Sequence, residues 1–209
     1  MPKHYAYDVA KRTIDLTVSL TGLALLSPLL LIVALLVRLK LGSPVFFAQE
    51  RAGLMGMPFT IFKFRSMTDA RDASGHLLPD SDRLPPFGRL LRSTSLDELP
   101  QLFNVALGHM SLVGPRPLYV RYIPRYTDTQ RRRLDTKPGI TGWAQVNGRN
   151  SVDWGTRLAQ DIYYIDNKSF ILDLKILLLT IKKVIIRQGI SAQNQATMTE
   201  FMGCEDAHD

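Results

Sequence analysis

Two adjacent carboxylates, Asp97 and Glu98, give the strongest chemical signal in the sequence. They lie in RSTSLDELPQLFNV, residues 92–105, which also holds a cation, Arg92, five residues before Asp97. Carboxylate oxygens are the ligands that Mg²⁺ prefers, and an Asp or Glu carboxylate can serve as a nucleophile. The pair therefore suggests metal binding or covalent chemistry, and a neighbouring cation would suit an anionic substrate.

A purely structural interpretation of the same pair stays open. Ser95 and Glu98 have the spacing of a capping box at the start of a helix, and an acid at position 97 would complement the helix dipole. Pro100 disturbs that helix start, because its nitrogen cannot donate a hydrogen bond to Leu96. We therefore expect the backbone of the pair to be irregular.

The motif GPRP, residues 114–117, presents another cation. Pro115 and Pro117 restrict φ on both sides of Arg116 and remove two backbone donors. A guanidinium held on a stiff backbone suits phosphate oxygens. Pro-X-Pro also occurs in ordinary turns, so the motif alone does not establish an anion site.

Two more cations lie on a predicted β-hairpin. Residues 45–49 and 58–67 have the pattern of strands, and a glycine-containing loop at 53–56 separates them. Alternation in the second strand puts Lys63 and Arg65 on the same face. That face is either a solvated edge or an anion site.

A glycine-rich segment, KPGITGWAQVNGRN at residues 137–150, contains Trp143, Gln145, Asn147 and Arg149. Such residues could approach a ligand closely, stack on it and hydrogen-bond to a base or sugar. The segment matches neither a Walker loop nor a dinucleotide-binding fingerprint. A glycine-rich hairpin without a ligand remains the alternative.

An uncharged stretch of 22 residues, 16–37, precedes these motifs and could form a helix that crosses a hydrocarbon layer of about 30 Å. Ser27-Pro28 interrupts the stretch, so we expect a kink or a break. Cations flank both ends, which favours a helix that enters and leaves by the same face. A Pro-kinked transmembrane helix and a buried core helix are the alternatives.

A second apolar helix is predicted at residues 170–187. Asp173, Thr180, Lys183 and Arg187 fall on one narrow arc, and Ile, Leu and Val cover most of the remainder. We expect this helix to lie in a membrane interface. The acidic tail from Thr199 is expected to fray.

The composition limits the class of protein. The 209-residue chain carries 26 Lys and Arg against 19 Asp and Glu, a net charge of +7, and is 45% hydrophobic. This balance excludes disordered, collagen-like and disulfide-scaffold proteins, and the single Cys204 excludes an internal disulfide. The arginine run at 131–133 is expected to be a solvated helix face that could meet anionic lipid headgroups. The sequence contains no recognised nucleic-acid reader motif.

Six segments together resemble the small monotopic polyprenol-phosphate phosphoglycosyl transferases, the bacterial initiating sugar transferases. They are KRTIDL with the Ser27-Pro28 stretch, FKFRSM, RSTSLDELPQLFNV, MSLVGPRP, KPGITGWAQVNGRN and DIYYIDNKSFILDLKILLLT, in family order. They extend from Lys11 to about Gly189. The chain looks most similar to the branch that transfers N,N'-diacetylbacillosamine phosphate to undecaprenyl phosphate for protein glycosylation.

The resemblance implies a two-step reaction. Asp97 would attack the β-phosphate of a UDP-sugar, release UMP and hold the phosphosugar until polyprenol phosphate takes it. Mg²⁺ would sit at Asp97, and Glu98 would assist. The substrate-binding residues predicted from these motifs are Lys63, Arg65, Arg92, Arg116, Asn147 and Arg149. A different sugar (N-acetylgalactosamine, galactose or glucose) or a non-enzymatic lipid-binding scaffold are the alternatives.

The predicted fold is a helix-rich α+β monotopic membrane protein with a re-entrant helix broken at Ser27-Pro28, interfacial amphipathic helices and a small β-hairpin. Residues 1–40 would form the membrane helix with basic flanks, 41–198 a cytosolic catalytic domain with interfacial helices, and 199–209 the acidic tail. The predicted location is the cytoplasmic face of the bacterial inner membrane. Its partners there would be anionic and zwitterionic phospholipids of the cytoplasmic leaflet, and no nucleic acid is expected.

Overall fold

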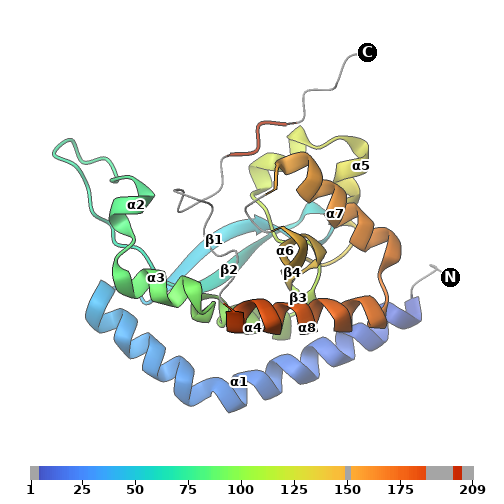
Figure 1. The fold of residues 1–209 in the computed structure, drawn as a ribbon, viewed down its shortest axis with the longest axis horizontal. Coiled ribbons are helices and arrows are strands. Elements are labelled where there is room, and N and C mark those ends of the chain that lie inside the picture. Colours follow the sequence, from blue (N-terminus) through green and yellow to red (C-terminus); the bar gives the residue numbers. More distant parts are fainter. Residues whose placement is uncertain (1–4, 149–151, 187–199, 204–209) are drawn as a thin grey trace.

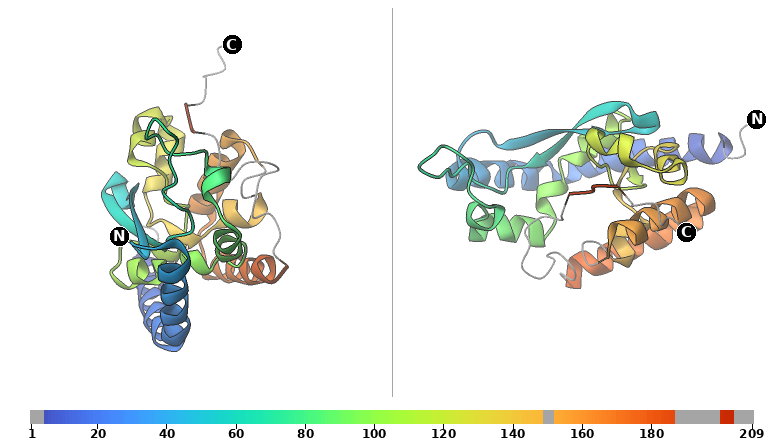
Figure 2. Two further views of the ribbon diagram at one scale, coloured as in Figure 1. Left: turned by 90° about the vertical axis from the view of Figure 1, so that its left-hand side faces the viewer. Right: turned by 90° about the horizontal axis from the view of Figure 1, so that it is seen from above.

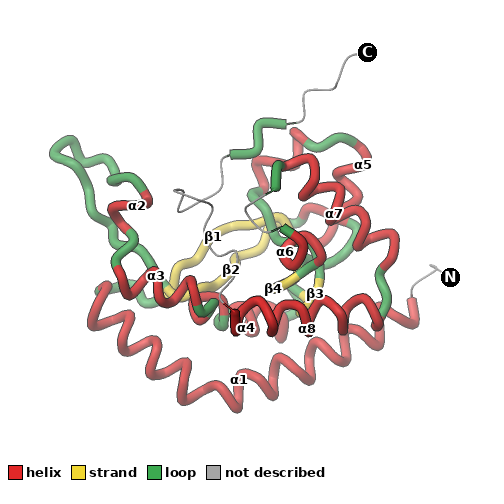
Figure 3. The backbone as a smooth tube through the Cα atoms, in the orientation of Figure 1, coloured by secondary structure: helices red, strands yellow, loops and turns green. Residues whose placement is uncertain are grey.

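The computed structural model describes residues 5–148, 152–186 and 200–203. Helices dominate these residues, and the two sheets are small (Figure 3). The helix-rich mixed fold predicted from the sequence is therefore confirmed. A long helix, α1, runs along the base of the body, and the remaining elements lie above it (Figure 1).

Helix α1, Tyr5–Leu41, contains Pro28 and bends near its middle (Figure 1). Proline lacks the N–H that would bond to the carbonyl of Ala24, four residues earlier. The hydroxyl of Ser27 donates to that same carbonyl at 2.8 Å. The Ser-Pro pair thus removes one backbone hydrogen bond and replaces it with a side-chain bond, which matters where no water is available.

Most of α1 is exposed. It is the one helix of the described residues whose length and hydropathy would let it cross a membrane, and 11% of its most apolar window is buried. Leu25, Leu31 and Leu39 are each more than 70% exposed. A core helix would bury such residues, so the buried-core alternative is wrong.

The first half of α1 is attached to the body by polar contacts. Arg12 donates to the carbonyl oxygens of Val105 and Ala106 at 2.6 and 2.8 Å, at the end of another helix, α4 (Gln101–Ala106). The carboxylate of Asp15 accepts from the backbone N–H of Leu112 at 3.0 Å. A cation at a helix C-terminus satisfies orphan carbonyls and complements the dipole.

The second half of α1 is attached by apolar contacts. Val33, Val37 and Leu41 form a buried cluster with Phe64 of the hairpin and Leu91 of α3 (Pro86–Ser93). Both halves of the bent helix therefore lie against the same body. The outer surface between these contacts is apolar and exposed.

The predicted hairpin is confirmed. Strands β1, Phe46–Ala52, and β2, Pro58–Phe64, pair antiparallel around a short turn, η1, Leu54–Gly56. Phe59 and Ile61 on one face of β2 are buried against Val105 and Met110. Lys63 follows them at the same two-residue spacing.

A second, parallel pair of strands was not predicted. Strand β3, Ser111–Val113, pairs with β4, Gly139–Thr141, and α6, Trp143–Asn147, follows directly. The glycine-rich segment is therefore a strand, a turn and a short helix, and the hairpin alternative is wrong. A Cβ at Gly142 would lie 2.1 Å from the carbonyl oxygen of Gly114, so glycine permits close backbone approach within the protein.

The remaining elements complete the body. They are α2 (Asp80–Arg83), η2 (Leu96–Glu98), η3 (Val120–Arg125), α5 (Asp128–Arg131), η4 (Arg132–Leu134), α7 (Trp154–Asn167) and α8 (Phe170–Ile186). Helices α8 and α1 both lie toward the base of the body (Figure 1). Asp173 of α8 joins the two helices, because it accepts hydrogen bonds from Tyr7 and Lys11 of α1 at 2.7 and 2.5 Å.

Helix α8 turns its polar arc inward. Asp173 is buried, and the hydroxyl groups of Thr180 and Thr141 hydrogen-bond at 2.7 Å. The outward side is apolar, with Ile171, Leu174, Leu178, Ile181 and Ile185 exposed. The expected amphipathic helix is present, and its apolar side is the exposed one.

The described end of the chain, Glu200–Gly203, contacts the body on the side opposite α1 (Figures 1 and 2). Phe201 is fully buried among Leu118, Tyr122, Tyr126 and Leu158. The expectation that the tail frays from Thr199 is therefore wrong for these residues. The acidic composition predicted solvation, but one aromatic side chain decides the packing.

Candidate active site

The acidic pair lies on an irregular turn, as Pro100 predicted. Leu96–Glu98 form a single 3₁₀ turn, and α4 begins only at Gln101. Ser95 has φ of 57° and makes no capping hydrogen bond through its side chain. The capping-box interpretation of Ser95 and Glu98 is wrong, because the Glu98 side chain is bound elsewhere.

Glu98 is shared by two cations from distant parts of the chain. Its Oε1 accepts from Lys63 Nζ at 2.6 Å and from Arg116 Nη2 at 2.8 Å. Lys63 comes from the hairpin and Arg116 from the GPRP motif. Burial alone would raise the pKa of Glu98, but the Arg116 and Lys63 charges and their hydrogen bonds outweigh it, so the pKa is strongly lowered. Glu98 is therefore ionised at neutral pH.

Asp97 is next to Glu98 in the sequence, but its surroundings differ from those of Glu98. The residue is 7% exposed, and within the described parts of the chain no hydrogen bond or ion pair reaches its carboxylate. Burial and the neighbouring Glu98 charge raise its pKa to about 6, although Lys63, Arg92 and Arg116 oppose the shift. A buried carboxylate without a protein partner has its oxygens available for a ligand, a metal or a bond-forming step.

Asn104 fixes the pair relative to the hairpin. Its side-chain amide donates to the carbonyl of Thr60 at 2.7 Å and accepts from the N–H of Phe62 at 3.1 Å. Asn104 lies on α4 directly after the acidic turn and is fully buried. These two bonds hold α4 against β2, which brings Lys63 to Glu98.

Arg92 and Arg65 both donate to Met67 but differ in their other partners. The charge of Arg92 acts on Asp97, and its Nε donates to Ser66 at 3.0 Å. Arg65 pairs with Asp69 at 2.5 Å and donates to the carbonyl of Ser43 at 2.6 Å. The structure thus places Arg92 with the acidic pair and turns Arg65 toward the following loop.

Two cations, Arg51 and Arg157, whose charges interact with Arg116, were not predicted from the sequence. The pKa of Arg51 is lowered by burial and by the Arg116 charge, although Tyr119 opposes this. Burial and Arg116 also lower the pKa of Arg157 to about 10. Arg51 could have been found, because it pairs with Phe59 in the hairpin and therefore shares a face with Lys63. Such crowding of positive charge suits a multiply charged anion.

A buried ion pair supports the backbone of the GPRP motif. Arg133 and Asp161 have side chains 2% exposed and approach to 2.8 Å. The same guanidinium donates to the carbonyl of Arg116 at 2.7 Å. The prediction that residues 131–133 form a solvated face is therefore wrong for Arg133, which holds the backbone that presents Arg116.

The glycine-rich segment contributes less to the site than its composition suggested. Asn147 is exposed and donates to the carbonyl of Trp143 at 2.9 Å, within its own helix, and Arg149 lies outside the described residues. Trp143 stacks on Tyr163 with ring centroids 5.4 Å apart and has Lys175 over its ring. Gln145 differs, because neither polar atom of its buried amide has a partner.

The carboxylate of Asp97 has the donor chemistry that Mg²⁺ prefers. This ion commonly binds one or two carboxylates and completes its shell with water and substrate phosphates. Asp97 offers unpartnered carboxylate oxygens, and the described residues contain no cluster of three metal-ligating side chains. The chemistry of the donor set therefore fits Mg²⁺ bound with a phosphate substrate, with Asp97 as the protein ligand.

Comparison with known proteins connects this arrangement to a family. A family model described as bacterial sugar transferase matches residues 6–187, which include every element from α1 to α8. The Bacillus subtilis protein named uncharacterized sugar transferase EpsL is 54% identical over 198 residues, 95% of this chain and 98% of its own length.

Two relatives carry more specific names. The UDP-glucose:undecaprenyl-phosphate glucose-1-phosphate transferase of Klebsiella pneumoniae is 43% identical over 87% of this chain. The undecaprenyl-phosphate galactose phosphotransferase of Salmonella typhimurium is 39% identical over 86% of it. The matched region spans 41% of the length of each of these two proteins.

Proposed function

Because the chain belongs to the bacterial sugar transferase family, we propose that it transfers a sugar 1-phosphate from a UDP-sugar to undecaprenyl phosphate and releases UMP. The chain is a phosphoglycosyl transferase. The observation that carries the proposed mechanism is the buried carboxylate of Asp97, which no described residue binds, beside a cation-bound Glu98. This reaction would be the first membrane step in assembling a glycoconjugate.

In the first half-reaction, a carboxylate oxygen of Asp97 attacks the β-phosphorus of the UDP-sugar. A bond forms between that oxygen and phosphorus, and the bond from phosphorus to the oxygen shared with the α-phosphate breaks. UMP leaves with the electron pair, so the sugar phosphate stays on Asp97 as a mixed anhydride. In the second half-reaction, an oxygen of polyprenol phosphate attacks the same phosphorus and the carboxylate leaves.

The chain's cations have distinct tasks in this scheme. Lys63 and Arg116 keep Glu98 ionised, and they would face the diphosphate that Asp97 attacks. Arg92 adds a charge beside Asp97. Preorganised cations stabilise charge on a transferring phosphoryl group without reorganisation during the reaction. Arg65, Asn147 and Arg149 remain predicted substrate contacts.

Mg²⁺ would be held by Asp97 together with the substrate phosphates, and it would supply charge neutralisation of the diphosphate. Asp97 must be ionised for either role, so a cation near it favours the reactive form. Glu98, already neutralised by Lys63 and Arg116, would orient these cations and not hold the metal.

The protein is proposed to be monotopic on the cytoplasmic face of the inner membrane, with α1 re-entrant at Ser27-Pro28. Contacts of both α1 halves with the same body support this topology, because a spanning helix would carry one end away from the body. The exposed apolar sides of α1 and α8 would lie among phospholipid acyl chains and headgroups.

Cysteine labelling in sealed vesicles tests the topology. In a Cys204→Ser background, single cysteines at Lys3 and Lys40 should react with a membrane-impermeant maleimide from the same side. Reaction from opposite sides would establish a spanning helix and contradict the proposal.

A UMP-release assay with undecaprenyl phosphate and a panel of UDP-sugars tests the reaction and the donor together. N,N'-diacetylbacillosamine is the proposed sugar from the sequence resemblance, whereas two named relatives use glucose and galactose. N-acetylgalactosamine completes the panel. Liposome binding without UMP release from any donor would favour the scaffold alternative.

Mass spectrometry tests the covalent intermediate. The enzyme, treated with a turnover-competent UDP-sugar and no polyprenol phosphate, should carry an added sugar-phosphate mass on the peptide containing Asp97. The same peptide from Asp97→Asn should remain unmodified. A modification on any other residue would assign the nucleophile elsewhere.

A further inference from the structure

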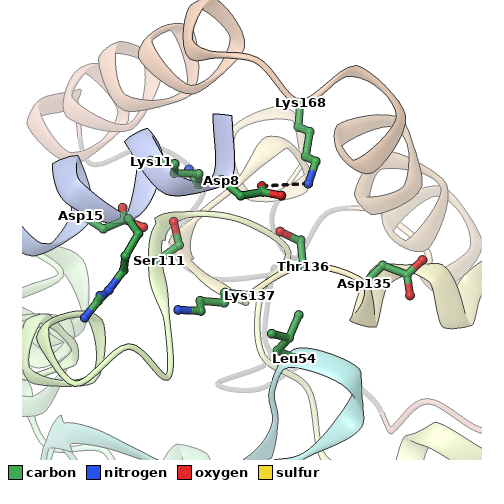
Figure 4. A pocket seen from close by; sticks show the side chains of 10 residues that line it. Asp8, Lys11, Asp15, Leu54, Ser111, Asp135, Thr136, Lys137 and Lys168 are labelled. Atoms are coloured by element: carbon green, nitrogen blue, oxygen red, sulfur yellow. Dashed lines mark hydrogen bonds and ion pairs between the residues drawn. The ribbon is translucent and has the colours of Figure 1, made fainter. Parts of the chain in front are cut away.

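A cavity with several charged residues in its wall lies away from the acidic pair. It has a volume of about 250 Å³ and is bounded by the start of α1, the η1 turn, β3, and the segment that joins η4 to β4 (Figure 4). None of Lys63, Arg92, Asp97, Glu98 and Arg116 lines it. The cavity is therefore separate from the proposed catalytic site.

Most charges around the cavity are already matched. Asp8 pairs with Lys168 at 3.0 Å (Figure 4), and Lys11 pairs with Asp173 at 2.5 Å. Arg12 is bound by carbonyls of α4, and Asp15 is bound by the N–H of Leu112. Asp135 lies on the exposed side, where water screens its charge.

Two groups on the cavity wall have no partner among the residues that the structure describes. Ser111 is 2% exposed, and its hydroxyl makes no hydrogen bond. Among the described residues, no ion pair or hydrogen bond involves the ammonium group of Lys137. Ser111 lies on β3 and pairs with Gly139, the first residue of β4, and Lys137 lies two residues before Gly139. A buried hydroxyl and a cation thus line one cavity without a protein acceptor.

The surroundings of Lys137 leave its charge poorly compensated. Burial and the charge of Arg12 lower its pKa, and Asp15 only partly opposes them. An anion in the cavity would supply the missing compensation and would accept from Ser111 at the same time. A metal cation would gain little, because Asp8 and Asp15 already have partners.

We propose that this cavity binds a phosphate group between Lys137 and Ser111. A phosphate offers several acceptor oxygens to an ammonium and a hydroxyl together, and lysine commonly binds phosphate as a point charge. The volume is below that of sites for drug-sized ligands, so a headgroup or a small phosphate fits. Val9, Ile14 and Val18 of the same half of α1 are exposed, which brings a phospholipid headgroup within reach as well as a soluble phosphate.

Competitive lysine acetylation of the full-length protein tests this proposal. The labelling rate of each lysine is measured by mass spectrometry in maltoside micelles, with inorganic phosphate added over a concentration series. Saturating phosphate should slow the labelling of Lys137 at least threefold and leave the exposed Lys182 unchanged. Lys63 reports independently on phosphate bound at the acidic pair.

Vesicles distinguish the two sources of phosphate. Phosphatidylglycerol vesicles should protect Lys137 if the ligand is a lipid headgroup, whereas vesicles of a phosphate-free galactolipid should not. Protection by inorganic phosphate alone would assign a soluble ligand. Equal protection by both kinds of vesicle, without an effect of inorganic phosphate, would show only membrane coverage and overturn the proposal.

Ser111→Ala is the matched variant, because it removes one hydroxyl and no charge. It should raise the phosphate concentration that half-protects Lys137 at least threefold and leave the curve for Lys63 unchanged. A thermal melt checks that the variant is folded. An unchanged Lys137 curve in folded Ser111→Ala, or no protection by phosphate in the wild type, would contradict the proposed site.

Discussion

Two ion clusters lie close together in this protein, and each joins a carboxylate to one or two cations. In one, Asp161 is bound by Arg133, which also binds Tyr126 and the carbonyl of Arg116. In the other, Glu98 is bound by Lys63 and Arg116, and no described residue forms a hydrogen bond or ion pair with the adjacent Asp97. Arg116 belongs to both clusters, through its backbone in the first and its side chain in the second.

The difference between the two clusters distinguishes a structural role from a chemical one. In the Arg133 cluster the acid is matched and the side chains are almost inaccessible. The Glu98 cluster has side chains 20 to 33% exposed and one unmatched carboxylate. A matched buried pair holds structure, whereas an unmatched buried acid can bind or react.

Asp97→Asn should have the largest effect, on turnover. It keeps the shape of the side chain but removes the proposed nucleophile and metal ligand, so UMP release should fall at least about 1,000-fold. The assay is UMP release at saturating UDP-sugar and Mg²⁺. Asp128→Asn, which changes an exposed acid, is the control and should keep full activity. Full UMP release by Asp97→Asn would show that Asp97 is not the nucleophile and would contradict the chemical role given to the Glu98 cluster.

Arg133→Met should give the largest loss of stability. It removes the ion-pair partner of the buried Asp161 and frees the carbonyl of Arg116, so the free energy of unfolding should fall by about 3–5 kcal/mol. Denaturant unfolding in detergent measures it. Arg132→Met is the neighbouring control, because the Arg132 pair with Asp166 is exposed and should contribute at most about 1 kcal/mol. Equal losses would show that burial does not distinguish the two pairs.

Glu98→Gln should have a smaller effect on stability than Arg133→Met. The amide keeps the shape but removes the anion that Lys63 and Arg116 bind, and water and the nearby Asp97 charge partly compensate them. We expect a loss of about 1–3 kcal/mol. The same unfolding experiment, made without substrate, measures it. A loss as large as that of Arg133→Met would mean that the Glu98 cluster is equally structural.

The smallest expected effect is the pH dependence of folding stability that comes from Asp97. Its pKa in the folded protein is raised to about 6, above the unfolded value near 4, so the folded state holds the proton longer. Stability from this group is therefore present at low pH and is lost as pH rises through about 6.

The measurement compares Asp97→Asn with the wild type in Mg²⁺-free buffer. The variant should be more stable by about 1–2 kcal/mol above pH 7, and the difference should shrink toward pH 4. A variant less stable than the wild type at pH 8 would show that ionised Asp97 is matched in the folded state.

The hairpin and the irregular acidic turn could be predicted because their signals are local. Alternation over a few residues predicts strands, and Pro100 disturbs a helix within its own turn. The capping-box prediction failed because Lys63 and Arg116 compete for Glu98 from 35 and 18 residues away. The prediction of a solvated face at 131–133 failed for Arg133, because Asp161, 28 residues away in the sequence, pairs with it in the interior.

The family, the apolar segments and the chemical residue types were determined by the sequence alone, because they depend on composition, spacing and motif order. Only the tertiary structure decided which acid is neutralised and which remains unmatched. Asp97 and Glu98 are neighbours with similar side chains, so no local signal separates them. Their opposite pKa shifts arise from burial and from cations that folding brings to one carboxylate and not to the other.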